Sequence, residues 1–335
     1  MDWVYKKLWI IKENLLNTFA TSFVLGMFYF GPLVSVLITT SLVLSPLSPL
    51  LPFYLIWMYL DRKTPFRKGR RMGLLRSAKL HQRFRDYFPM SLIKTADIPP
   101  TKNYIFCCFP HGILGVGVHG EFSGENPQFQ KLFPGINPLC HTLDSNFYYP
   151  FSREYVISMG YRSVSKEALL NNLTKGPGNA SVIVVGGSAE AMHCKTGEHR
   201  VILRNRKGFV KLAITCGADL VPIYAFGEND LYHHYMFPED SIIYKIQQAV
   251  RSFTGVAPTL VSGRGLFQSI FGLLPYKRPL HIVVGKPISV EKKENPTNEE
   301  ISALHMTFTQ ELVNLFDNYK YKYLPKPDSV FLEVE

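Results

Sequence analysis

A stretch of forty-seven residues without a charged side chain, Asn14 to Leu60, limits most strongly what this chain can fold into. As one helix it would be about 70 Å long, whereas the hydrocarbon core of a bilayer is roughly 30 Å thick. Gly31-Pro32 and the three prolines Pro46, Pro49 and Pro52 interrupt it, and such residues favour helix ends and turns. We therefore expect a helical hairpin that dips into or through a membrane. A removable signal peptide fits less well, because its apolar region usually has about 7–15 residues.

Basic residues stand on both sides of this apolar stretch: Lys6, Lys7 and Lys12 before it, and Arg62, Lys63, Arg67, Lys68, Arg70 and Arg71 after it. Basic flanks favour the cytosolic side of a membrane, so both ends are expected there. We divide the chain into an N-terminal segment with the hairpin, residues 1–61, and a cytosol-facing domain, residues 62–335. The net charge of +11 then suits an anionic membrane surface and phosphate-bearing ligands better than nucleic acid.

Short apolar runs alternate with helical patterns in the rest of the chain. The predicted strands are residues 104–109, 181–185, 220–226 and 281–284, each bounded by glycine or proline. Helices are predicted over residues 166–173 and 208–216, and a further one begins at Thr297, where Glu300 completes a capping box. This alternation predicts an α/β domain with a mainly parallel sheet. The five cysteines lack the spacing of a metal site and are typical of a reducing compartment.

A histidine follows the first of these strands directly, in the sequence Pro110-His111-Gly112. Ligands of parallel sheets bind beyond the carboxyl ends of the strands, so His111 is a candidate general base. The next predicted strand ends in a glycine-rich turn that carries Glu190. If the two strands are neighbours, Glu190 can orient His111 or stabilise its charged form. The alternative is a carboxylate that only stabilises the start of a helix.

Three further groups of residues are candidates for substrate binding. Arg204, Arg206 and Lys207 precede the predicted helix 208–216, where dipole and charge together favour phosphate, although an ordinary solvated basic surface remains the alternative. Asn229 follows the strand 220–226, and Arg264 stands between two glycines.

Three other patterns are weak. Gly115 to Gly120 matches the dinucleotide-binding fingerprint in its letters, but the loop is apolar and is separated from the preceding strand by His111. Gly186 to Glu190 lacks the last glycine of a nucleophile elbow. The histidines 193, 199, 233 and 234 do not have the spacing of a zinc site, so no metal is expected.

Taken together, the chain resembles the type-two diacylglycerol acyltransferase family, which includes monoacylglycerol and wax-alcohol acyltransferases. The apolar stretch corresponds to the membrane hairpin of that family. The matching motifs are Asn103-Tyr-Ile-Phe106, Phe109-Pro-His-Gly112, Phe133-Pro-Gly135, Arg153-Glu-Tyr155, Val184-Val-Gly-Gly187 with Glu190, Arg204-Asn-Arg-Lys-Gly-Phe209, Val221-Pro222, Phe226-Gly-Glu-Asn229, Gly263-Arg-Gly265 and Val284-Gly285.

The resemblance implies a glycerolipid-acyltransferase-like α/β domain and acyl transfer from acyl-CoA, with no other cofactor. The acceptor would be diacylglycerol, with monoacylglycerol or a fatty alcohol as alternatives, and the location the endoplasmic reticulum membrane or the lipid-droplet surface. His111 and Glu190 would be catalytic. Substrate would be bound by Phe109, Pro110, Gly112, Arg153, Arg204, Arg206, Lys207, Asn229 and Arg264. The resemblance leaves assembly into a homo-oligomer open.

One motif departs from the family. Phe109 stands where the family usually has the first histidine of His-Pro-His-Gly. We expect this phenylalanine to replace a structural imidazole in packing, with activity intact. The alternative is a non-catalytic lipid-binding member of the family.

Overall fold

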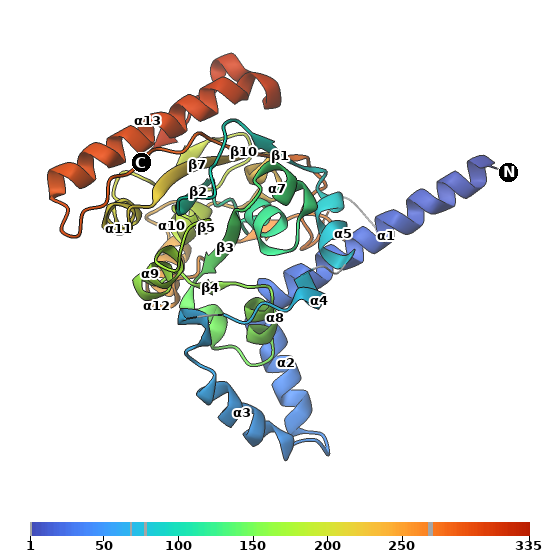
Figure 1. Cartoon of the computed structure of the whole chain (residues 1–335). Coiled ribbons are helices and arrows are strands. Elements are labelled where there is room, and N and C mark those ends of the chain that lie inside the picture. Colours follow the sequence, from blue (N-terminus) through green and yellow to red (C-terminus); the bar gives the residue numbers. More distant parts are fainter. Residues whose placement is uncertain (1, 68, 77–78, 267–270) are drawn as a thin grey trace.

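The structure of the protein is a computed structural model that describes residues 2–67, 69–76, 79–266 and 271–335. Lys68, one of the expected basic flanking residues, lies outside the described residues. The fold is built on a seven-stranded sheet with the order β1-β10-β7-β2-β5-β3-β4 (Figure 1). Its strands are β1 Met90–Lys94, β2 Tyr104–Phe109, β3 Asn137–Thr142, β4 Arg162–Ser163, β5 Asn179–Val184, β7 Asp219–Phe226 and β10 Leu280–Val284.

The strand directions confirm the predicted α/β class with a mainly parallel sheet. β10 is antiparallel to β7, and the other neighbouring strands are parallel. All four predicted strands are present, with β2 at the predicted bounds and the others starting one or two residues early. β1 and β3 were not predicted, because they are short of β-branched residues and β3 contains Pro138. Four short strands lie outside this sheet: β6 Arg200–Val201, β8 His233–His234, β9 Val261–Ser262 and β11 Glu333–Val334.

Helices cover both faces of the sheet. α9, α11 and α13 enclose one hydrophobic core, which includes Phe109. α5, α6, α8 and the end of α1 enclose the other core, which includes Phe106. The helices are α1 Asp2–Phe28, α2 Gly31–Val43, α3 Leu50–Leu60, α4 Gly73–Arg76, α5 Lys79–Tyr87, α6 Val116–Val118, α7 Pro127–Leu132, α8 Ser152–Ser158, α9 Lys166–Leu173, α10 Gly187–Met192, α11 Gly208–Cys216, α12 Ile242–Thr254 and α13 Asn298–Tyr323.

Helix ends follow the local sequence closely. α9 and α11 have the predicted bounds, and α11 stops at Gly217, which adopts a left-handed conformation with φ of 67°. At the start of α13 the Thr297 hydroxyl accepts from the Glu300 N–H, and the Glu300 carboxylate accepts from the Thr297 N–H. The predicted capping box is therefore confirmed.

The apolar N-terminal stretch forms three helices. α1 and α2 meet at an angle of 82° at Gly31, where a Cβ atom would be only 2.7 Å from the Ser152 hydroxyl of α8. The chain bends but does not reverse at Gly31-Pro32. It reverses between α2 and α3, where the predicted breakers Pro46 and Pro49 lie, and α3 leads back to the domain (Figure 1). Among the described helices, none alone has the length and apolar character needed to cross a membrane. Only α1 and α2 taken together, with the bend between them, have both.

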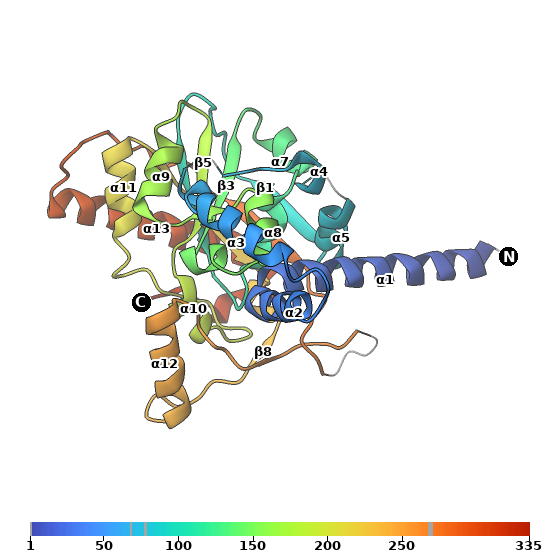
Figure 2. The same ribbon diagram turned by 90° about the horizontal axis from the view of Figure 1, so that it is seen from below.

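From Glu13 onward, α1 is part of the folded domain. Val24 and Leu25 are buried in the core, and the Glu13 carboxylate lies 2.8 Å from Arg83 of α5. α3 contacts the domain through Tyr54, which stacks on Phe151 with ring centroids 4.6 Å apart. Both ends of the apolar stretch are thus fixed to the domain, whereas the first half of α1 extends away from it (Figures 1 and 2).

Candidate active site

Three neighbouring strands bring the candidate residues together. β7, β2 and β5 are adjacent and parallel, so their carboxyl ends lie at one edge of the sheet. Residues 110–118, which we call the His111 loop, follow β2. Glu190 belongs to α10, which follows β5, and Glu228 lies two residues after β7. The expected proximity of the strands that carry His111 and Glu190 is therefore correct.

Glu190 binds the backbone of His111 and does not contact its ring. One carboxylate oxygen accepts from the His111 N–H at 2.5 Å, and the other accepts from the Ile202 N–H at 2.9 Å. Burial raises the pKa of Glu190 to about 7. Both oxygens are occupied by amide donors, so Glu190 holds His111 in place from behind. The sequence suggested that Glu190 orients His111 or stabilises its charged form; in the structure its contact is with the backbone of His111.

Glu228 is a second buried carboxylate that binds the His111 loop, and the sequence did not reveal this role. Its oxygens accept from the N–H groups of Val116 at 2.7 Å and Gly117 at 2.8 Å, and burial raises its pKa to about 7. Gly112 packs directly on it, since a Cβ atom there would be 2.6 Å from the Glu228 Cγ. Its place immediately after a buried strand, next to Asn229, was the signal that could have identified it.

The amide groups that Glu228 occupies belong to the segment that matched the dinucleotide fingerprint. In a dinucleotide site such N–H groups at a helix start are free to bind pyrophosphate. Here a carboxylate of the protein fills that place, so the loop does not offer these donors to a nucleotide.

The ring of His111 faces a cavity of about 480 Å³. Its Nδ1 lies 3.1 Å from the Gly112 carbonyl oxygen. A carbonyl can only accept, so Nδ1 carries the hydrogen and Nε2 is left with the lone pair. Burial lowers the pKa of His111, which keeps the ring neutral near pH 7. This histidine therefore has the protonation state that a general base requires.

The cavity is mostly apolar and is closed partly by the N-terminal helices. Tyr29, between α1 and α2, donates its hydroxyl hydrogen to the Leu114 carbonyl of the His111 loop. Besides residues of the His111 loop, the cavity is lined by Phe28, Phe30, Pro32, Leu143, Tyr149, Tyr161, Val184, Tyr232, residues 255–259, Val261 and Leu273, among others. Apolar cavities with a few polar groups at one end are typical of sites for lipid-like ligands.

A second histidine, His141 of β3, also lines the cavity, but both of its ring nitrogens have protein partners. Nδ1 is 2.7 Å from the Ser163 carbonyl and Nε2 is 3.2 Å from the Ser181 hydroxyl. Burial lowers its pKa to about 4. His141 is therefore occupied structurally, in contrast to His111.

We call residues 204–207 the basic loop. Its three basic side chains lie on the surface beside this site. The Arg206 guanidinium is 3.3 Å from the Gly186 carbonyl, next to Gly187 of the cavity lining. Lys207 bonds to Ser302 of α13, and Arg204 approaches the Val334 carbonyl. Their side chains are exposed, so the loop presents positive charge to solvent at the start of α11.

Other residues predicted to bind substrate have structural partners and do not line the cavity. The guanidinium of Arg153 is buried and pairs with Asp61 at 3.0 Å and with Glu154, which fixes α8 to the end of α3. Asn229 donates to the Glu198 carbonyl at 2.8 Å. Arg264 bonds to the carbonyls of Gly265 and Leu266.

Phe109 also lies away from the cavity, in the core on the other face of the sheet. It is fully buried, and its ring centroid is 6.2 Å from that of Phe308. This placement fits the expectation that Phe109 has a packing role. Pro110 follows through a cis peptide bond; it is buried and does not line the cavity.

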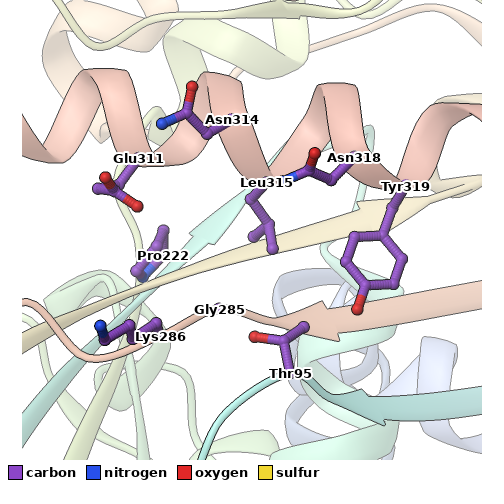
Figure 3. A pocket seen from close by; sticks show the side chains of 9 residues that line it. All are labelled: Thr95, Pro222, Gly285, Lys286, Glu311, Asn314, Leu315, Asn318 and Tyr319. Carbon is purple, nitrogen blue, oxygen red and sulfur yellow. The ribbon is translucent and has the colours of Figure 1, made fainter.

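A second cavity, of about 400 Å³, lies between α13 and the sheet (Figure 3). Glu311, Asn314 and Asn318 of α13 line one side, while Pro222 and Gly285 line the other. Gly285 donates its N–H to the Pro222 carbonyl at 2.8 Å, so these two motif residues join the end of β10 to β7. In the part of the chain that the structure describes, no group of three metal-binding side chains is present in either cavity or elsewhere.

Comparison with known proteins gives a consistent result. Residues 40–334 match the family model described as diacylglycerol acyltransferase. Human 2-acylglycerol O-acyltransferase 1 is 43% identical over 325 residues, covering 96% of this chain and 97% of the relative. Human diacylglycerol O-acyltransferase 2 is 46% identical over 283 residues, covering 84% and 73%. Diacylglycerol O-acyltransferase 1 of Schizosaccharomyces pombe is 41% identical over 280 residues, covering 84% and 81%.

Among solved structures, the 1-acyl-sn-glycerophosphate acyltransferase PlsC from Thermotoga maritima is similar with a TM-score of 0.41 and 10% sequence identity. The match covers 90% of this chain and 97% of that chain.

Proposed function

Because this chain belongs to the diacylglycerol acyltransferase family, we propose that it transfers the acyl group of acyl-CoA to a free hydroxyl of an acylglycerol. That it is an acyltransferase follows from the activities that its relatives' names share. The observation that carries the mechanism is the position of His111: its ring faces an apolar cavity at the carboxyl ends of three strands, with Nε2 available to accept a proton.

In the proposed reaction, Nε2 of His111 takes the hydroxyl proton of the acceptor as its oxygen attacks the thioester carbonyl carbon. The tetrahedral adduct then expels the CoA thiolate, which receives the proton from the imidazolium. The products are an ester and free CoA. General base catalysis of this kind contributes typically about 10²–10⁴ in rate.

The oxyanion of the adduct needs hydrogen-bond donors close to His111. Within the His111 loop, the N–H of His111 is taken by Glu190, that of Gly115 by the His111 carbonyl, and those of Val116 and Gly117 by Glu228. This leaves the amides of residues 112–114 and of Val118 as the candidates. Glu190 and Glu228 are positioning residues in this proposal, because they fix the loop through its backbone.

We propose that the basic loop binds the phosphates of CoA. Arg206 lies next to the Gly186–Gly187 turn, and Gly187 lines the cavity, so a nucleotide at the surface and an acyl chain in the cavity would be close neighbours. Charge-assisted contacts from arginine suit phosphate groups well.

Diacylglycerol is the acceptor that we propose first, as the family description and the similarity to diacylglycerol O-acyltransferase 2 support it. Monoacylglycerol is the second candidate, since the similarity to 2-acylglycerol O-acyltransferase 1 extends over nearly the full length of both chains.

We further propose that α1 to α3 attach the protein to the endoplasmic reticulum membrane or the lipid-droplet surface with the sheet domain in the cytosol. α2 and α3 have 13 and 11 residues, roughly 20 Å or less in length, which suits a hairpin that enters a bilayer without crossing it. Apolar side chains of both helices are exposed, among them Leu33, Leu37 and Phe53.

The experiment that tests the function uses purified full-length protein, labelled oleoyl-CoA, and diacylglycerol, monoacylglycerol and a long-chain alcohol in parallel assays. Products are identified by mass spectrometry. A labelled triacylglycerol supports the first acceptor, and labelled diacylglycerol from monoacylglycerol supports the second. No transfer to any acceptor, with acyl-CoA bound, would identify a non-catalytic lipid-binding protein instead.

A further inference from the structure

The polarity of α12 is the reverse of that of an ordinary surface helix. Ile242, Ile243, Ile246, Val250 and Phe253 are exposed, and Phe253 is 93% exposed. Their spacing places them on one side of the helix, in a stripe about 100° wide. We call these five residues the apolar stripe. Apolar faces of helices normally pack on the protein core, whereas this one points away from it.

Polar groups of α12 face the protein instead. Gln247 is buried, and its side-chain amide donates to the Pro258 carbonyl at 2.8 Å. The helix is well defined at both ends: the Ser241 hydroxyl accepts from the Tyr244 N–H at 3.1 Å, and Gly255 closes the helix with φ of 76°. The exposed apolar stripe therefore belongs to a regular, capped helix whose polar side packs on the segment that follows it.

The chain that follows the apolar stripe leads to the cavity that holds His111. The chain that leaves α12 lines that cavity from Gly255 to Thr259. Val256 and Leu273 line the cavity and are also 43% and 63% exposed, so they form part of its rim. On another side the rim is formed by Phe30 and Pro32, at the α1–α2 bend. Figure 2 shows α12 and α1 projecting from the molecule in different directions.

The charged side chains within α12 are both positive. Its segment Ile242–Thr254 contains Lys245 and Arg251 and no acidic residue. Amphipathic helices with basic side chains beside an apolar face are typical of the interface between lipid headgroups and acyl chains. The same combination is less typical of the interface between two copies of a protein, where charged residues are depleted.

We propose that α12 is a second membrane-contact element, separate from the N-terminal helices, which lies along the headgroup region with the apolar stripe inserted among the acyl chains. The membrane surface would then border the cavity rim from two sides, and a lipid substrate could enter His111's cavity without passing through water. The proposal extends the proposed function, but membrane contact can be measured without turnover.

The test places an environment-sensitive fluorophore on α12 of the full-length protein. Cys216 is first replaced by alanine, because the four other cysteines are buried. Phe253→Cys in this background carries the label within the apolar stripe, and Ser252→Cys, an exposed neighbour on another side of the helix, is the matched control. The protein is bound to phosphatidylcholine vesicles containing phosphatidylserine, with nitroxide lipids as quenchers.

The label at residue 253 is expected to shift to shorter emission wavelengths and to be quenched by nitroxides near the headgroups, while the label at residue 252 stays in water. Equal, aqueous signals from both positions would overturn the proposal. So would a label at residue 253 that is protected without lipid and cross-links to a second copy, since that outcome identifies a protein interface.

Activity gives an independent readout. Replacing Ile246 and Phe253 by serine is expected to raise the apparent KM for acceptor lipid in vesicles by roughly tenfold, as two large apolar side chains no longer enter the bilayer. The KM for acyl-CoA should not change. If lipid quenching is found but no variant or wild-type protein turns over, the membrane contact stands and the proposed function fails. An unchanged KM together with an unquenched label removes the contact.

Discussion

The His111 loop and the basic loop were both predicted to be functional, yet they differ in how firmly the surrounding protein holds them. The His111 loop is enclosed, and two buried carboxylates bind its backbone at three N–H groups. The basic loop is exposed, and its cations have only single, peripheral contacts. The difference corresponds to what each task needs. Proton transfer requires a fixed atom, since errors of about 1 Å are costly, whereas a long-range attraction to phosphate tolerates movement.

Removing the imidazole of His111 should have the largest effect on kcat. His111→Asn is expected to lower kcat by about 10²–10⁴, because it removes the imidazole that would take the acceptor's proton. His141→Asn is the matched control: it removes a histidine from the same cavity, but one whose nitrogens are both engaged by the protein. Rates with labelled oleoyl-CoA decide the question. Equal losses in the two variants would show that His111 has no special role.

The pH dependence of kcat/KM sharpens this expectation. The base is the neutral ring, and burial holds the pKa of His111 below its ordinary value of 6.5. Activity should therefore be constant at and above pH 7 and fall about tenfold per unit at pH values below that lowered pKa. A midpoint above 6.5 would contradict the assignment.

The next largest effect is expected from Glu228, which holds the His111 loop, and it should appear in the free energy of unfolding. Glu228→Ala leaves the Val116 and Gly117 N–H groups without their acceptor. A loss of about 1–3 kcal/mol in the free energy of unfolding is expected for each unpaired buried donor. Denaturant unfolding in detergent micelles measures it, with Glu125→Ala, an exposed carboxylate, as control. If both variants unfold at the same denaturant concentration, the loop does not depend on Glu228.

Changes at the basic loop should be smaller and depend on salt. Replacing Arg204, Arg206 and Lys207 by glutamine is expected to raise the KM for acyl-CoA by roughly tenfold with little change in kcat, because each exposed charge contributes about 0.2–1 kcal/mol. The difference from wild type should shrink at high ionic strength. Lys131, Lys292 and Lys326, exposed and outside the basic loop, are replaced together as the control for net charge. A decrease in protein abundance alone would mean that the basic loop is structural.

The smallest effect on turnover is expected at Phe109, which lies outside both loops. Phe109→His should leave kcat per folded molecule within a few-fold of wild type. It should also lower stability by about 1–3 kcal/mol, as a polar ring enters the core beside Phe308. Phe109→Leu is the control for lost packing volume, and thermal unfolding followed by the transfer assay gives both quantities. Loss of turnover in the histidine variant alone would mean that the active site depends on the aromatic side chain.

Local patterns predicted much of the fold. The helix bounds at Lys166 and Gly208 and the Thr297 capping box rely on contacts within a few residues, so they could be predicted from the sequence. β1 and β3 could not, because their pairing with distant strands stabilises them more than their own composition does. The apolar stretch was recognised, and its reversal between α2 and α3 lies at the predicted breakers Pro46 and Pro49. The bend at Gly31 could be placed but not shaped from the sequence, because its angle of 82° goes with close packing on Ser152 of α8.

The sequence by itself determined the α/β class, the family, the position of His111 after a buried strand and the cluster of cations before α11, because each is written in neighbouring residues or in a motif. The tertiary structure alone decided which atom each carboxylate binds. Glu190 meets a backbone amide, Glu228 becomes the second support of the His111 loop, and Arg153 pairs with Asp61. The physical reason is that a buried charge must find a partner, and only the packed chain determines which donors lie within hydrogen-bond distance.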